Sequence, residues 1–88
     1  MKAYFNEQPL EIYETIVYPA PYLRHEAGRF VNFRLFEKGV LKIECDTAPK
    51  SVIIRPKRLD LTAKISENTI EIPLDKPCNF SVEPNGDI

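Results

Sequence analysis

Acidic side chains are the first residues to test for chemistry, because general acid–base catalysis often uses paired carboxyl groups. Hydrolysis of a glycosidic bond needs two such groups roughly 5–9.5 Å apart. Glu11 and Glu14 fall on opposite faces of one extended segment. Glu71 and Asp75 share a face, but four residues along a strand separate them by about 13 Å. No single strand therefore offers a catalytic pair, and charges spaced in this way are typical of a solvated strand face.

His25 is the single histidine, so any Ser-His-Asp or Cys-His arrangement would have to use it. It stands between Arg24 and Glu26 in a polar segment. No serine lies in the glycine-flanked turn that nucleophilic serines occupy, and no Cys/His spacing fits zinc. We predict an exposed loop histidine, no catalytic residue, no metal site and no cofactor.

The two cysteines, Cys45 and Cys78, each follow the alternation of neighbouring apolar residues. Two cysteines are too few for a disulfide framework. We predict two free, buried thiols that act as small hydrophobic side chains. A bridge between them is the alternative.

Aromatic residues are the best candidates for binding. Tyr18 and Tyr22 flank the stiff segment Pro19-Ala20-Pro21. Aromatic faces on rigid loops stack on sugar rings or anchor interfaces. Three interpretations remain: the tyrosines cap the fold, contact another domain, or bind sugar directly. Tyr4 and Phe5 near the N-terminus have the same alternatives.

The elements that position these residues are β-strands, because apolar and polar residues alternate and no window shows helical spacing. Seven runs with strand character occur, at 10–18, 30–36, 41–45, 51–55, 61–65, 70–74 and 78–83. Turn residues separate them every 8–12 residues, which is typical of sandwiches. The sequence therefore predicts one all-β domain, residues 1–88, folded as an immunoglobulin-like antiparallel β-sandwich of about seven short strands.

The pattern also predicts local details. Runs 30–36 and 41–45 are expected to form a hairpin, with Gly39 at a turn position that needs a positive φ angle. Run 51–55 is almost entirely apolar, which indicates burial on both faces or a central place in a sheet. Pro73 indicates an edge strand, or a strand with a free N–H side.

The composition indicates which classes of partner to exclude. The 88 residues carry 12 Lys and Arg against 13 Asp and Glu, a formal net charge of −1. Nucleic-acid binding needs a clustered positive excess, so we expect no nucleic acid as partner. No apolar run approaches the roughly 20 residues of a membrane span, so we expect no membrane contact. The first residues lack an apolar secretion signal, which slightly favours the cytoplasm while leaving export open.

Asn85-Gly86 is a strong hairpin signal, and only Asp87 and Ile88 follow it in this sequence. A hairpin needs a returning strand, so we expect this domain to be the truncated N-terminal part of a longer polypeptide.

Four motifs follow in order: SVIIRP at 51–56, ISENTI at 65–70, LDKP at 74–77 and FSVEPNGD at 80–87. This series resembles the small N-terminal β-sandwich of pectin-lyase-like β-helix glycoside hydrolases of the dextranase and polygalacturonase type. The resemblance covers residues 51–87 and extends to 10–45 in strand pattern alone.

The resemblance implies a non-catalytic accessory domain of a carbohydrate-active enzyme. Its partner would be its own downstream catalytic β-helix, which would carry the catalytic carboxylates, and beyond that a polysaccharide. The alternatives are a free-standing carbohydrate-binding module and a protein-interaction sandwich.

Overall fold

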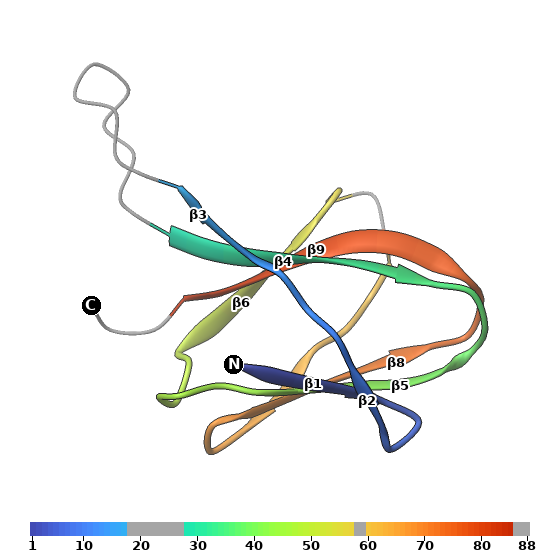
Figure 1. Cartoon of the computed structure of the whole chain (residues 1–88), viewed down its shortest axis with the longest axis horizontal. Coiled ribbons are helices and arrows are strands. Elements are labelled where there is room, and N and C mark those ends of the chain that lie inside the picture. Colours follow the sequence, from blue (N-terminus) through green and yellow to red (C-terminus); the bar gives the residue numbers. More distant parts are fainter. Residues whose placement is uncertain (18–27, 58–59, 86–88) are drawn as a thin grey trace.

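The computed structural model describes residues 1–17, 28–57 and 60–85, and all of its regular elements are β-strands (Figure 1). None of these segments forms a helix long and apolar enough to cross a membrane. The strands are β1 (Lys2–Phe5), β2 (Gln8–Leu10), β3 (Glu14–Val17), β4 (Gly28–Leu35), β5 (Gly39–Glu44), β6 (Ser51–Arg55), β7 (Lys64–Ser66), β8 (Thr69–Leu74) and β9 (Cys78–Asn85).

The strands form two sheets packed face to face, which confirms the predicted antiparallel β-sandwich (Figure 1). One sheet has the order β2-β1-β5-β8-β7 and the other β3-β4-β9-β6. Every pair of neighbours is antiparallel. The described residues thus contain nine strands rather than about seven.

Both additional strands come from the N-terminal region. Lys2–Phe5 forms β1, which the sequence analysis did not assign to a strand. The predicted run 10–18 is wrong as a single strand, because Leu10 ends β2 in one sheet and Glu14 begins β3 in the other. The chain crosses between the sheets over residues 11–13, where Tyr13 is exposed.

The core lies between the sheets and takes alternate side chains from both. Its buried hydrophobic members are Ala3, Phe5, Val31, Phe33, Leu35, Leu41, Ile43, Cys45, Ile70, Ile72, Leu74, Phe80 and Val82. The predicted inward faces of β4, β5 and β8 are therefore confirmed. Phe33 and Phe80 face one another across β4 and β9, with ring centroids 5.7 Å apart. A tilted aromatic pair of this kind stabilises beyond the area that it buries.

The predicted hairpin between 30–36 and 41–45 is wrong. β4 and β5 lie in different sheets, so residues 36–38 form an arch across the sandwich. Both strands still direct their apolar residues inward, because the arch turns those two faces toward each other.

Gly39 serves a different purpose from the one expected. None of the described glycines has a positive φ angle. A Cβ atom at Gly39 would instead overlap the side-chain amide of Asn6. That amide accepts the N–H of Val40 at 2.9 Å and donates to the carbonyl of Lys38 at 3.4 Å. The backbone N–H of Asn6 also donates to the Val40 carbonyl at 3.0 Å. Gly39 is thus required by the close approach of the β1–β2 turn.

The edges of the sheets also differ from the prediction. β6 is an edge strand of the four-stranded sheet, and its three central residues are half-buried, so the expected central position is wrong. Run 61–65 becomes a strand only at Lys64. Pro73 lies in β8 beyond the last residue that pairs with β7, so one side of the strand has no described neighbour there, in agreement with the prediction of a free N–H side.

Candidate functional site

The residues singled out as binding candidates are only partly described. Tyr18 and Tyr22, the possible interface or sugar-stacking pair, lie outside the described residues, as does His25. Tyr4 and Phe5 separate as neighbours on a strand do: Phe5 enters the core, whereas Tyr4 is half-buried on the outer face of β1.

The acidic residues lie apart on the surface. Glu11 accepts a hydrogen bond from the Tyr13 hydroxyl at 2.9 Å. Glu71 stands opposite Lys42 on β5 and Lys64 on β7. Within the described ranges, no three His, Cys, Asp or Glu residues come close enough to hold a metal ion.

Neither cysteine forms a disulfide, so the alternative of a bridge does not hold. Cys45 is buried as predicted, whereas Cys78 is only half-buried. Cys45 follows the end of β5, while Cys78 pairs with Leu35 beside the arch that leads to the start of β5. The six residues of β5 therefore separate them by roughly 20 Å. Burial raises the pKa of the Cys78 thiol; nearby Lys76 lowers this pKa and Asp75 raises it.

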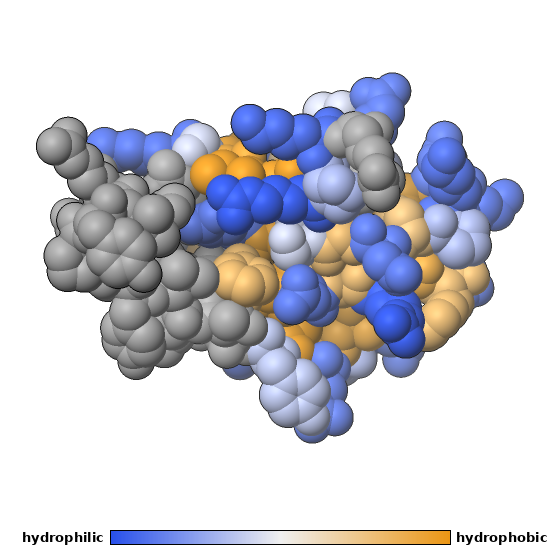
Figure 2. Space-filling view, turned by 90° about the horizontal axis from the view of Figure 1, so that it is seen from above, coloured by the Kyte–Doolittle hydropathy of each residue, from blue (hydrophilic) through white to orange (hydrophobic). Residues whose placement is uncertain are grey.

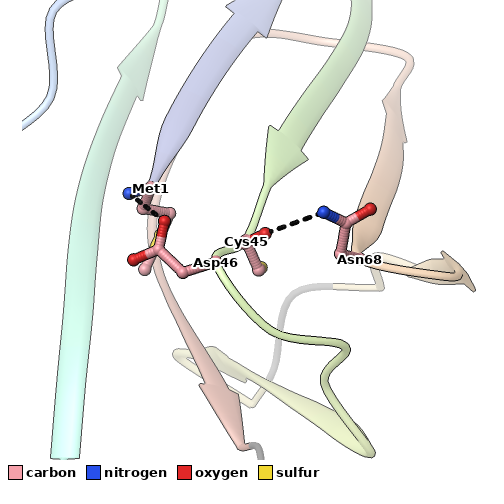
Figure 3. A network of polar contacts seen from close by, with 4 residues as sticks. All are labelled: Met1, Cys45, Asp46 and Asn68. Carbon is pink, nitrogen blue, oxygen red and sulfur yellow. Dashed lines mark hydrogen bonds and ion pairs between the residues drawn. The ribbon is translucent and has the colours of Figure 1, made fainter.

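Figure 3 shows how the chain is fixed around Cys45. The Asn68 side chain donates to the Cys45 carbonyl at 3.0 Å, and the Cys45 N–H donates to the Asn68 carbonyl at 2.7 Å. The N-terminal ammonium lies 3.4 Å from the carboxylate of the neighbouring Asp46. The two bonds of Asn68 anchor the β7–β8 turn to the end of β5, and the ion pair ties the N-terminus to the same place. Cys45 packs in the core.

Phe36 is the most exposed large hydrophobic residue among those described, at 78 %. It begins the β4–β5 arch, which the Asn6 amide holds at Lys38 and Val40. Val40 is 44 % exposed and stands opposite Pro73, but both lie on the outer face of the five-stranded sheet. We call the arch residues 36–38, which carry the exposed Phe36, the arch patch. The sequence already placed Phe36 on the outward side of its run, and that parity is the feature from which its exposure follows.

A second surface is the outer face of the four-stranded sheet. Figure 2, seen from this side, shows polar side chains crossing more apolar surface. A shallow hollow here is lined by residues of β4, β9 and β6, among them Asn32, Arg34, Arg55, Asn79 and Ser81. Arg55 also lies 3.7 Å from Glu83. Amides, a hydroxyl and guanidinium groups on a nearly flat face can hydrogen-bond a polar ligand.

A third surface is the side of the sandwich between β6 and β7, which we call the open side. A groove there is lined by Val52, Ile54, Leu61, Ala63 and Ile65, together with Lys57 and Thr62. Most of these apolar residues pack against the core and remain partly exposed. Ile65 is 40 % exposed. The sequence pattern does not predict this groove, because the groove forms from two sheet edges whose places in the fold the pattern leaves open.

Comparison with known protein families, with curated proteins and with solved structures found no match.

Proposed function

We propose that this chain is a non-catalytic accessory domain of a larger carbohydrate-active enzyme, and that it docks on the catalytic part through the arch patch. The carbohydrate-active parent rests on the resemblance of residues 51–87. The docking role rests on one observation, the 78 % exposure of Phe36 on an arch held by hydrogen bonds.

The backbone of the arch that carries Phe36 is already held at Lys38 and Val40. A partner that covers the ring therefore has less backbone to order on binding. Buried aromatic anchors of this kind carry much of the binding energy at protein interfaces.

The test compares Phe36→Ala in the 88-residue chain and in the native polypeptide that contains it. In the isolated chain the free energy of unfolding should change by no more than about 0.5 kcal/mol, because the ring is mostly in water. In the native polypeptide the same change should lower the melting temperature of this domain and weaken its contact with the catalytic part. Tyr13→Ala is the matched control, since Tyr13 is 75 % exposed away from the arch.

Two results contradict the proposal. One is a native polypeptide, identified by mass spectrometry after immunoprecipitation with an antibody to this chain, that has no activity on polysaccharides. The other is a Phe36→Ala variant that leaves the native polypeptide unaltered.

The second candidate is a carbohydrate-binding module that uses the outer face of the four-stranded sheet. Its support is the polar hollow with Asn32, Arg34 and Asn79. Affinity electrophoresis in gels that contain polysaccharides distinguishes the two. Direct sugar binding predicts retardation of the isolated chain that Arg34→Ala abolishes, whereas a docking domain migrates equally in every gel.

A further inference from the structure

Strand β6 differs from the other three sheet edges. Edge strands expose unpaired N–H and C=O groups, and proteins protect them with short length, proline or charge. β2 and β7 have three residues each, with Pro9 in the middle of β2 and Lys64 in β7. β3 has four residues and begins with Glu14. β6 has five residues, and its centre is Val52-Ile53-Ile54, with neither proline nor charge.

The outward edge of β6 pairs with no other described strand. β9 is its single neighbour among the described strands. The three central residues are half-buried rather than covered, and Val52 and Ile54 line the groove of the open side. An added strand would thus gain backbone hydrogen bonds and cover apolar surface that faces water.

The residues of β6 are self-complementary in one antiparallel register. If Ile53 of one copy stands opposite Ile53 of another, Val52 meets Ile54, and Ser51 meets Arg55. Apolar residues then face apolar ones, and no like charges stand directly opposite. Because opposite residues in an antiparallel pair point to the same face, the inner faces of both copies also coincide.

Neighbouring registers are worse for definite reasons. A shift by one residue places the inner face of one copy against the outer face of the other. A shift by two toward the C-terminal end places Pro56 in the ladder, where proline has no N–H to donate. The register centred on Ile53 is the one that pairs all five residues.

We propose that β6 joins two copies of this chain, antiparallel and centred on Ile53, so that two four-stranded sheets form one sheet of eight strands. The same surface is used on both copies, so the contact closes on itself as a dimer. Five residue pairs bury a small area, so we expect a weak dimer, with a dissociation constant between about 1 µM and 1 mM. This inference goes beyond the proposed function and uses a different surface.

The first experiment is analytical ultracentrifugation of the chain from micromolar to millimolar concentration. A monomer–dimer equilibrium is expected, and Ile53→Lys should weaken it at least tenfold. Within one chain the new ammonium group stands opposite Glu83, which the fold tolerates, whereas across the dimer two ammonium groups face each other. Val40→Lys, on the outer face of the other sheet, is the matched control and should dimerise as the parent does.

The second experiment tests the register. Two thiols introduced by Ile53→Cys would lie on facing residues about 4.5–5.5 Å apart, within the reach of a disulfide. Two thiols introduced by Ser51→Cys would lie about 13 Å apart. Mild oxidation followed by peptide mapping should therefore give a 53–53 bridge and no 51–51 bridge. Three results would overturn the self-pairing: a chain that stays monomeric at 1 mM, a dimer that Ile53→Lys leaves intact, or equal bridging at positions 51 and 53. None of these results bears on the Phe36 test of the proposed function.

Discussion

Two asparagine side chains fix both ends of β5, the central strand of the five-stranded sheet. Asn6 holds the start of β5 from the β1–β2 turn, and Asn68 holds its end from the β7–β8 turn. Each turn contains residues with positive φ angles, 50° at Asn6 and 55° at Glu67. Turn chemistry visible in the sequence therefore also sets the position of a neighbouring strand.

Removal of the Asn6 amide should destabilise the chain. Asn6→Ala leaves the Val40 N–H without its acceptor and places alanine at a positive φ angle, which together should cost about 1–3 kcal/mol. Asn6→Gly restores the backbone freedom alone and should cost less. Urea unfolding measures both, with the exposed Asn79→Ala as control. Equal stability of Asn6→Ala and the parent would show that the turn amide contributes nothing.

A methyl group at Gly39 should act through Asn6. Gly39→Ala forces the Asn6 amide out of its place, so it should destabilise by about 1–3 kcal/mol through the loss of the two hydrogen bonds of that amide. In an Asn6→Gly background the same change no longer meets the Asn6 side chain and should cost much less. A double-mutant cycle by urea unfolding measures this coupling. Simple additivity of the two changes would contradict the steric explanation.

The Cys78 thiol should ionise at a higher pH in the folded chain than in the unfolded chain. Burial raises its pKa, so at mildly alkaline pH the folded chain holds less thiolate than the unfolded chain. Stability is unaffected below the ordinary thiol pKa and falls as the pH rises above it, because the unfolded thiol ionises first. Iodoacetamide should modify Cys78 more slowly in the folded chain, as peptide mass spectrometry can follow. Reaction at the same rate in folded and urea-unfolded chain would refute this.

At the scale of elements, alternation predicts faces better than partners. The predicted inward residues of β5 and β8 are confirmed one by one, since Leu41, Ile43, Ile70 and Ile72 are fully buried. The same alternation fits either a hairpin or an arch between two sheets, and the β4–β5 connection turned out to be an arch. Run 10–18 failed for a related reason, because an extended chain that passes from one sheet to the other keeps its period of two.

Strand β1 offers a direct test of alternation, because Tyr4 and Phe5 are adjacent and both aromatic. Phe5→Ala opens a cavity beneath β1 and should cost about 3–4 kcal/mol. Tyr4→Ala, on the outer face, should cost less than about 1 kcal/mol. Thermal and urea unfolding give both values. A similar loss from the two changes would mean that β1 does not pack on the core as described.

At the scale of the molecule, surfaces were harder to predict than the core. The exposure of Phe36 follows from strand parity alone, so the sequence predicts that part of the arch patch. The open side was not, because its groove combines β6 of one sheet with residues 61–65 next to the edge of the other. Such a surface depends on which strands become edges, and hydrophobic periodicity carries no information on strand order.

One core shared by two sheets should make the chain unfold as a unit. Ile43 of the five-stranded sheet is fully buried among side chains from both sheets. Ile43→Ala should lower stability by about 2–5 kcal/mol and should lower the protection of β9 amides, in the other sheet, by the same free energy. Native-state hydrogen exchange measures each amide, and Val40→Ala on the outer face of the same strand is the control. If the β9 amides kept their protection while those of β5 lost theirs, the two sheets would be separate cooperative units, and the sandwich would owe its stability to each sheet alone.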